Sequence, residues 1–540
     1  MSDGNQNNPA LTSAPSSRHG QLLKGAALSI LTALVLAACG GGGGSGGTPS
    51  TPGGATGGSG TTTPPTGLVE AIPPSTLSAN LCAAPRTGID PSTGQPYLDR
   101  QGTYADEKNW IRAYIDETYL WYNEIPSSIR VANYGTPQAL FDALRTPALT
   151  ASGKPRDQFH FIYDTAVWQA LTTSGIEAGY GFEVAILKST PPRDVRVAYT
   201  EPNTPASANA IVRGGRILFV DGVDVVTSNN VDALNAALFP KAAGETHSFR
   251  IQDLDGTIRT LSLTSTQITK TPVQNVKTVQ TATGKVGYFL FNDHIATSEQ
   301  LLVNAVNQLK ADGAQDLVLD IRYNGGGTLA IASELAYMIA GSAATSGKVF
   351  ERLVFNDKNP FELTVAEAST PFVTSTLGFS TQAGQALPQL NLSRVTVLTG
   401  PGTCSASESI INSLRGIGVA VNVIGETTCG KPYGFLPTDN CGTTYFAIQF
   451  KGVNDKGEGD YADGMAPTCT VADDFNHQLG DPAEGRFAAA LSYRVTGSCP
   501  AATATSLTLK SSLLGGEPLM SGKSPARTGR FLTPRSVTLR

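Results

Sequence analysis

Three continuous apolar stretches of sequence most constrain the fold of this chain. They lie at residues 316–322, 394–399 and 419–424, and turns and helical segments separate them. A strand with one solvated face alternates apolar and polar side chains. These stretches do not alternate, so both faces of each strand are expected to be covered. Glycine-rich turns follow the first two, at residues 324–327 and 400–404. Strands interleaved with helices in this way predict an α/β unit.

Two further regions precede this unit, and each has its own pattern. Residues 68–172 are expected to form an N-terminal helical domain, because apolar residues recur at helical spacing from 107 to 122. Residues 173–270 carry short strand patterns, including a hairpin that turns at Asp255-Gly256. The α/β unit is expected to span residues 271–500. The folded part is therefore predicted to have three units.

The first 39 residues have the pattern of an export signal. Basic residues precede an apolar run at 25–38, which is too short to span a bilayer comfortably. The end of this run, LAACG at residues 36–40, resembles the lipobox of bacterial lipoproteins, which implies lipidation of Cys39. We therefore expect a lipid anchor in the cell envelope, at the outer membrane and facing the periplasm or the cell surface. An uncleaved N-terminal anchor helix is the alternative.

Two segments of biased composition flank the folded part. Residues 40–67 consist almost wholly of Gly, Ser, Thr and Pro, which predicts a flexible tether. Residues 501–540 contain six basic residues against one acidic residue and are expected to form a flexible basic tail. The formal net charge of the whole chain is only -5. It implies no broad basic surface, so nucleic acid is not expected as a partner.

The cysteine count fits an exported protein. Without Cys39, six of the seven cysteines remain, and an even number in an oxidising compartment predicts disulfides. The sequence does not choose among the pairings. No cysteine pair has the spacing of a zinc site, so neither a metal nor another cofactor is expected.

Nucleophilic catalysis needs a reactive hydroxyl or thiol, a base within reach and donors for the developing oxyanion. Ser405 lies where the turn at 400–404 enters a helical segment at 406–414. The free N–H groups at such a helix start favour negative charge. The local sequence alone, however, favours Ser405 as a simple helix N-cap. No histidine outside the signal lies in a recognised triad motif, and a core or surface role is favoured for His294.

Three motifs in this unit resemble those of the C-terminal processing (tail-specific) peptidases. They read LDIRYNGGG at residues 319–327, GTCSASE at residues 402–408 and GETTCGK at residues 425–431. The resemblance implies an α/β catalytic domain of the crotonase-like (ClpP/crotonase) kind. It also implies a serine endopeptidase that acts on polypeptides through a serine–lysine dyad.

Carried over by residue, the resemblance assigns Ser405 as the nucleophile and Lys431 as the general base. The backbone N–H groups of Ala406 and Gly326 would form the oxyanion hole. A lysine is a base only when it is neutral, so Lys431 is expected to lie in an apolar pocket that lowers its pKa. Ser405 would attack a peptide carbonyl, and water would then release the acyl-enzyme.

The chain departs from the family pattern next to the lysine. Many members have Gln four residues after it, where this chain has Phe435, and many have Gly directly after it, where this chain has Pro432. Glu408 is the candidate orienting group, with a surface or capping role as the alternative. Cys404 and Cys429 lie beside the two dyad residues, and either a disulfide that braces the site or two small buried thiols would fit.

Three stretches of the middle region resemble a PDZ domain: GYGFEV at 179–184, PNTPA at 202–206 and RGGRILFVDG at 213–222. The resemblance implies a β-rich domain that binds an extended peptide by β-augmentation. Tyr180, Gly181 and Phe182 would then form the loop that binds its terminal carboxylate. The alternative is a module that only packs on its neighbour.

The sequence therefore predicts an exported, lipid-anchored serine endopeptidase that recognises the C-terminal region of its polypeptide substrates. One alternative is a non-catalytic peptide-binding adaptor lipoprotein with the same fold. Another is a crotonase-like enzyme that acts on thioesters. Retention of both Ser405 and Lys431 favours the peptidase.

Overall fold

The computed structural model describes residues 72–500 and residues 530–531. The predicted signal at 1–39 with Cys39, the tether at 40–67 and the rest of the basic tail lie outside the described residues. All described residues fall within the unit Glu70–Arg540. Within this described part, no helix combines the length and the apolar character needed to cross a membrane.

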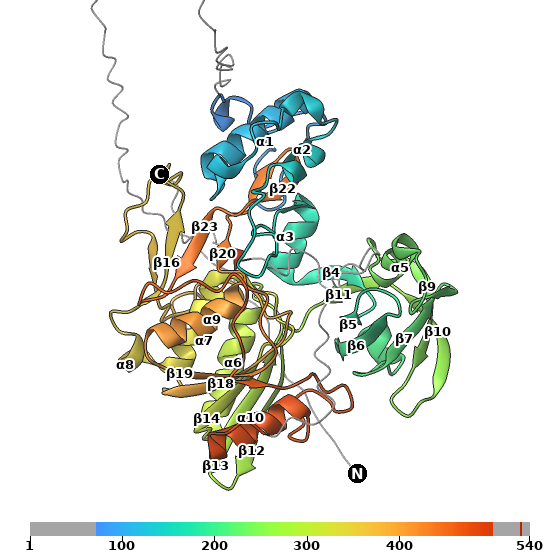
Figure 1. The fold of residues 1–540 in the computed structure, drawn as a ribbon, viewed down its shortest axis with the longest axis vertical. Coiled ribbons are helices and arrows are strands. Elements are labelled where there is room, and N and C mark those ends of the chain that lie inside the picture. The colour runs from blue at the N-terminus through green and yellow to red at the C-terminus, as the bar shows by residue number, and fades with distance from the viewer. Residues whose placement is uncertain (1–71, 501–529, 532–540) are drawn as a thin grey trace, which may run out of the picture. The chain divides into compact units, whose positions relative to one another are not determined.

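The sheet that carries the three apolar stretches has six strands (Figure 1). In spatial order they are β12 (Val273–Thr281), β13 (Gly284–Phe291), β14 (Asp316–Asp320), β18 (Arg394–Thr399), β19 (Ala420–Gly425) and β24 (Cys469–Thr470). Strands β13 to β24 are parallel, and β12 pairs antiparallel with β13 at one edge. The three stretches are confirmed as the neighbouring strands β14, β18 and β19.

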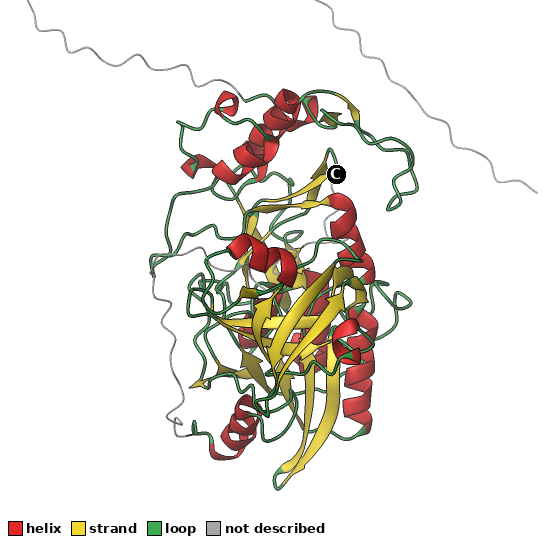
Figure 2. Cartoon of the chain, turned by 90° about the vertical axis from the view of Figure 1, so that its right-hand side faces the viewer, coloured by secondary structure: helices red, strands yellow, loops and turns green. Residues whose placement is uncertain are grey.

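Helices cover this sheet on both faces, as its unbroken apolar strands predict (Figure 2). These helices are α6 (Ser298–Ala311), α7 (Leu329–Ala340) and α9 (Ala406–Gly416) on one face and α10 (Gly485–Thr496) on the other. Leu317 and Leu319 belong to the cluster of the first face, whereas Val318 packs in the cluster that contains Phe487 of α10. Successive side chains of β14 thus point to opposite faces, and both are buried.

A four-stranded sheet and several short elements complete this α/β part. The sheet has the order β17 (Ser369–Pro371), β16 (Val349–Phe355), β23 (Phe450–Val453) and β20 (Tyr433–Gly434). Helix α8 (Ser342–Thr345) follows α7. Strand β15 (Gly327–Thr328) pairs in parallel with β25 (Arg530–Phe531), which brings a segment from near the C-terminus to the glycine-rich turn after β14.

The N-terminal region contains helices and short strands, and it shares its core with a distant segment. Its elements are η1 (Ser75–Leu77), β1 (Leu81–Cys82), β2 (Arg100–Gln101), α1 (Tyr104–Thr118), η2 (Tyr122–Glu124), η3 (Val131–Asn133), α2 (Pro137–Ala143), β3 (Phe161–Asp164) and α3 (Thr165–Ser174). Strand β3 pairs with β22 (Thr443–Phe446), which also pairs with β21 (Thr438–Asn440). Trp110 of α1 stacks on Tyr114 and contacts Tyr445 of β22. These aromatic residues of α1 therefore form a buried helix face.

Residues 182–264, here called the small β-sheet unit, have a core of their own. Their elements are β5 (Phe182–Lys188), β6 (Asp194–Thr200), α4 (Pro205–Ala208), β7 (Arg216–Val220), β8 (Val223–Asp224), α5 (Val231–Leu238), β9 (Thr246–Gln252) and β10 (Ile258–Thr264). The hairpin predicted at Asp255-Gly256 is confirmed as β9–β10. The chain enters through β4 (Ile176–Gly179) and leaves through β11 (Thr266–Thr269), and these two strands pair with each other.

A buried ion-pair network lies at the carboxyl end of β14. Arg322 Nη1 lies 2.7 Å from both Glu484 Oε1 and Asp473 Oδ1. The Nη2 atom of Arg322 lies 2.9 Å from Asp320 Oδ2. Asp473 also binds Arg213 of the small β-sheet unit, with an N–O distance of 2.6 Å. The network therefore ties the small β-sheet unit to the strand end from which the glycine-rich turn begins.

We expect Glu484→Gln to lower the free energy of unfolding by about 3 kcal/mol, because it leaves part of the Arg322 charge buried without its partner. Urea unfolding at neutral pH measures this change. Lys348→Gln is the control, since it removes an exposed ion pair with Asp455 and should change stability by less than about 1 kcal/mol. Equal effects of the two substitutions would contradict the prediction.

The same carboxylate contributes to the pH dependence of stability. Burial alone would raise the pKa of Glu484, but the charge and hydrogen bonds of Arg322 hold it below its ordinary value of 4.5. Its contribution is therefore present above about pH 4.5 and is lost as the pH falls through the folded-state pKa. The Glu484→Gln variant should lose less stability than the unmodified chain on acidification.

Candidate active site

The three motifs meet where β14, β18 and β19 end. These strands are adjacent and parallel, so the turns that follow them leave the same edge of the sheet. Backbone hydrogen bonds join the turns: the N–H of Cys404 donates to Asn324 O at 3.0 Å, and the N–H of Cys429 donates to Thr403 O at 3.0 Å. The fold thus brings the glycine-rich turn, Ser405 and Lys431 into one place.

Ser405 occupies the residue before α9 in a strained backbone conformation. Its φ is 60° and its ψ is -115°, a region that residues with a side chain rarely adopt. The residue is fully buried, and its Oγ has no hydrogen-bond partner among the described residues. The Oγ of Ser407, by contrast, donates to Asn324 O at 3.0 Å. Ser405 thus stands at the N-cap position, but its hydroxyl does not cap the helix.

Lys431 lies in an aromatic pocket. The residue is fully buried, and its Nζ is 4.5 Å from the ring centre of Phe159 and 4.1 Å from that of Phe435. Phe159 comes from the N-terminal region, and Phe435 stands where many family members have Gln. Two aromatic rings thus lie against the amine of Lys431, and the departure at Phe435 supplies one of them.

Glu408, on the first turn of α9, links the two predicted dyad residues through their backbones. Its carboxylate accepts the N–H of Ser405 at 2.8 Å and the N–H of Lys431 at 2.8 Å. It also accepts the N–H of Gly430 at 2.9 Å and the hydroxyl of Thr428 at 2.5 Å. Burial raises the pKa of Glu408, and these hydrogen bonds oppose that rise. Glu408 is fully buried, so the surface role considered for it is wrong, whereas its hydrogen bond from the N–H of Ser405 confirms the capping role.

A disulfide joins the same two turns. Cys404 and Cys429 are bonded, with 5.2 Å between their Cα atoms, so the alternative of two buried thiols is wrong. Two further bonds, Cys82–Cys441 and Cys469–Cys499, pair the other four cysteines of the described residues and confirm the disulfide prediction. Cys404, Glu408 and Cys429 place potential metal ligands within 4.8 Å of one another, but both sulfurs are used in the disulfide.

Asn324 organises the glycine-rich turn, and its place before three glycines was the only sequence signal that pointed to it. Its Oδ1 accepts the N–H of Gly326 at 3.0 Å and lies 3.0 Å from His294 Nδ1. Its Nδ2 donates to Phe291 O. The N–H of Gly326, predicted for the oxyanion hole, is thus engaged by Asn324. Ala406, the other predicted donor, is the first residue of α9, where helical N–H groups lack intrahelical partners.

The residues predicted for peptide binding lie at the start of the edge strand β5 of the small β-sheet unit. The hydroxyl of Tyr180 donates to Ala237 O of α5 at 2.9 Å, which fixes the loop against that helix. Gly181 has a φ of 89°, and a Cβ there would lie 2.2 Å from Thr204. Phe182 begins β5, and β6 is the strand paired with β5 in the described sheet.

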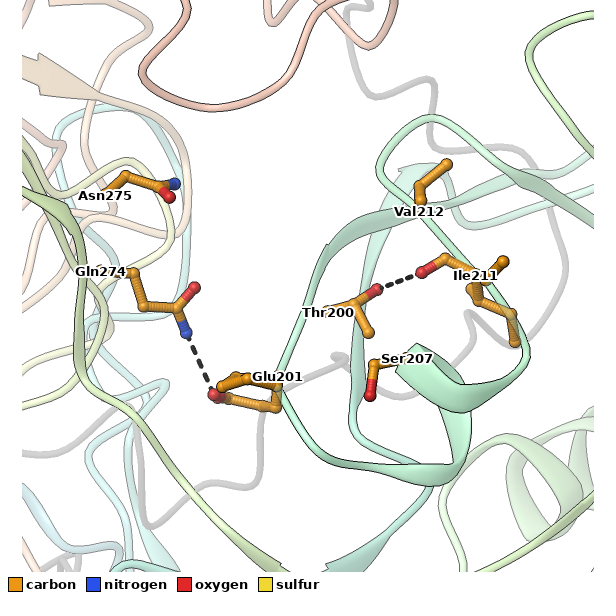
Figure 3. Close-up of a pocket in the computed structure, with 9 residues that line it drawn as sticks. Thr200, Glu201, Ser207, Ile211, Val212, Gln274 and Asn275 are labelled. Atoms are coloured by element: carbon orange, nitrogen blue, oxygen red, sulfur yellow. Dashed lines mark hydrogen bonds between the residues drawn. The ribbon is translucent and has the colours of Figure 1, made fainter.

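A separate cavity of about 420 Å³ lies between the small β-sheet unit and β12 (Figure 3). Glu201 faces Gln274 across it, and Gln274 Nε2 donates to the Glu201 carboxylate at 3.0 Å. Its lining includes none of the residues predicted for catalysis or for peptide binding.

We expect Glu408→Gln to lower the free energy of unfolding by about 2–3 kcal/mol, because an amide nitrogen would then face backbone donors in a buried site. Thermal and urea unfolding measure the loss. Glu367→Gln is the matched control, since Glu367 accepts the N–H and the hydroxyl of the exposed Thr364. A loss at Glu408 no larger than that at Glu367 would show that the four buried hydrogen bonds contribute little.

Comparison with known proteins supports the family predicted from the three motifs. Residues 285–462, which contain Ser405 and Lys431, match the model of peptidase family S41. Residues 106–159 match the model of the peptidase S41 N-terminal domain. A protein of Bacteroides fragilis described as an S41 protease has a similar structure, with a TM-score of 0.54 and 24% identity over 71% of this chain and 96% of that chain.

Two curated relatives are named for carboxyl-terminal processing. The carboxyl-terminal-processing protease of Picosynechococcus sp. is 30% identical over 265 residues, which cover 48% of this chain and 56% of that protein. Carboxyl-terminal-processing peptidase 2, chloroplastic, of Arabidopsis thaliana is 23% identical over 331 residues, covering 59% and 58%. The chain thus spans somewhat more than half the length of these relatives. The family to which these two segments of the chain are similar is peptidase family S41.

Proposed function

We propose that this protein is a serine endopeptidase with Ser405 as nucleophile and Lys431 as general base. The observation that carries the proposal is the shared attachment of both residues to Glu408. One buried carboxylate accepts the backbone N–H of each residue at 2.8 Å, so the two turns are held in a defined relation. The strained backbone of Ser405 and the aromatic pocket of Lys431 support the same assignment.

In the proposed reaction the neutral amine of Lys431 takes the proton of Ser405 as its Oγ attacks a peptide carbonyl. The developing oxyanion would be bound by the N–H groups of Ala406 and Gly326. The N–H of Gly326 must then leave Asn324 Oδ1, so the substrate oxygen would replace an internal acceptor. Lys431 returns the proton to the leaving amine, and water hydrolyses the acyl-enzyme by the same route.

We propose that the substrate backbone binds along the edge of the glycine-rich turn. Strand β25 already pairs there with β15, in the register Gly327 to Arg530 and Thr328 to Phe531, and it also lies against β20. An extended chain thus fits between the turn after β14 and the segment that follows Lys431. A polypeptide substrate would bind by the same kind of backbone pairing.

We further infer that the small β-sheet unit is PDZ-like and that the α/β unit is crotonase-like. The exposed edge of β5, the adjacent α5 and the loop Tyr180–Phe182 support a groove for a C-terminal peptide. The predicted lipid anchor at Cys39 would hold the enzyme in the cell envelope, where exported polypeptides are its substrates. A peptide-binding adaptor without catalysis is the competing function.

We expect Ser405→Ala and Lys431→Ala each to reduce cleavage of an unfolded protein with an apolar C-terminus by at least about a thousandfold, because each removes a member of the catalytic unit. The chain from residue 40 onward is assayed by gel and mass spectrometry. Ser413→Ala, two turns farther along α9, is the matched control and should retain activity. Equal cleavage by all variants would refute the dyad, and peptide binding without cleavage by the unmodified chain would favour the adaptor.

We expect peptides with a free C-terminal carboxylate to bind more tightly than their amides, by about tenfold, because the amide cannot accept charge-assisted hydrogen bonds from the loop. Binding is measured by calorimetry on the Ser405→Ala variant, so that cleavage does not interfere. Equal affinities for the free-acid peptide and its amide would show that the small β-sheet unit does not recognise the C-terminal carboxylate.

A further inference from the structure

We propose that the Cys404–Cys429 disulfide is a positioning element of the catalytic site and that its reduction by a dithiol turns the peptidase off. The inference rests on the proposed function of Ser405 and Lys431. Cys404 directly precedes Ser405, and Cys429 stands two residues before Lys431. The disulfide therefore covalently ties the turn of the nucleophile to the turn of the base.

The turns need such a link because strand pairing ends before them. Strands β18 and β19 are paired as far as Thr399 and Gly425. Beyond that point, the N–H of Cys429 donates to Thr403 O, and the carboxylate of Glu408 binds the backbones of both turns. The disulfide adds a covalent constraint to these hydrogen bonds at the position where the reacting side chains begin.

Ser405 is the residue that depends most on this constraint. Its positive φ is unfavourable for a residue with a side chain, and surrounding structure must hold it there. Without the disulfide, the turn can relax and move Oγ away from the base and the oxyanion donors. A displacement of about 1 Å at a reacting atom costs about a hundredfold in rate. The loss should therefore appear mainly in kcat, since β15, which carries one side of the proposed substrate site, lies on another turn.

Reduction also changes the hydrogen bonding of Glu408. The Sγ of Cys429 lies 3.5 Å from Glu408 Oε2. As a thiol, Cys429 would be a new donor to this carboxylate and would compete with the N–H groups of Ser405 and Lys431. Breaking the bond therefore weakens the second link between the turns as well as removing the first.

The chemistry of reduction favours attack from one side. Cys404 is buried, whereas Cys429 is only partly buried, so we expect a dithiol to attack the sulfur of Cys429. The thiolate of the dithiol forms a mixed disulfide with Cys429. The electron pair of the broken S–S bond goes to the sulfur of Cys404, which becomes a thiolate. The second thiol of the reductant then displaces Cys429, so two electrons and two protons pass to the protein and the reductant leaves as its disulfide.

The other two disulfides offer matched controls. Cys469–Cys499 joins β24 to the chain beyond α10, and Cys82–Cys441 joins β1 to the segment between β21 and β22. Neither contains a neighbour of Ser405 or Lys431 in sequence. A general need for disulfides would affect these pairs too, whereas a positioning role is specific to Cys404–Cys429.

The experiment compares the oxidised chain with the double variants Cys404→Ala/Cys429→Ala and Cys469→Ala/Cys499→Ala. For each we measure kcat and KM of peptide cleavage, the rate of Ser405 labelling by a fluorophosphonate and the circular dichroism spectrum. The same assays follow stepwise reduction with dithiothreitol and reoxidation, with the disulfides mapped by mass spectrometry. EDTA is present throughout, so that reduced Cys404, Cys429 and Glu408 do not hold a metal.

We expect the Cys404/Cys429 variant to stay folded and to lose at least about tenfold in kcat and in labelling rate, with KM within about twofold. The Cys469/Cys499 variant should keep its kcat. In the unmodified chain, activity should fall and recover with the mapped state of Cys404–Cys429, and dithiothreitol should not affect the Cys404/Cys429 variant further.

An unchanged kcat in the folded Cys404/Cys429 variant would overturn the proposal. If that variant does not fold, the test is the unmodified chain. The proposal is then overturned if its activity does not change when Cys404–Cys429 is reduced. Absence of Ser405-dependent cleavage by the oxidised, unmodified chain is a different result, because it refutes the proposed function itself and the redox control with it.

Discussion

The candidate site depends on one buried carboxylate. Glu408 accepts four hydrogen bonds, and three of them come from the turn that carries Lys431 while the fourth comes from Ser405. An ionised group in such a position is costly unless its oxygens are satisfied, and here the donors are the backbones that must be placed. The hydrogen bonds that stabilise the buried carboxylate of Glu408 therefore also hold the two turns at a defined separation.

A second buried network supports the start of the glycine-rich turn. Arg322 is held by carboxylates from β14, from the segment before α10 and from the residue that caps α10. Tyr323, the next residue, accepts a hydrogen bond at 2.6 Å from Arg213 of the small β-sheet unit. The turn that presents Gly326 is thus anchored both to the sheet and to the small β-sheet unit, and its position depends on contacts between segments far apart in the chain.

The periodicity of apolar residues in the sequence was sufficient to predict the local secondary-structure elements. The unbroken stretches became β14, β18 and β19, and the hairpin at Asp255-Gly256 turned where expected, since both signals come from neighbouring residues. The joint core of the N-terminal helices and residues 433–448 could not be predicted, because β3 and β22 pair across a long separation in sequence. Asn324 was missed for a similar reason: its role lies in hydrogen bonds to Gly326, His294 and Cys404.

By itself the sequence determined the α/β pattern and the three motifs, because these follow from local order along the chain. The residues proposed for catalysis came from the resemblance of those motifs to a known family. Only the tertiary structure decided which cysteines pair, which aromatic rings surround Lys431 and what Glu408 binds. Each of these depends on distances between segments far apart in the chain, and such distances arise only when the chain has folded. The sequence alone favoured Ser405 as a helix cap. The structure shows a strained backbone at Ser405 and a hydroxyl with no hydrogen-bond partner among the described residues.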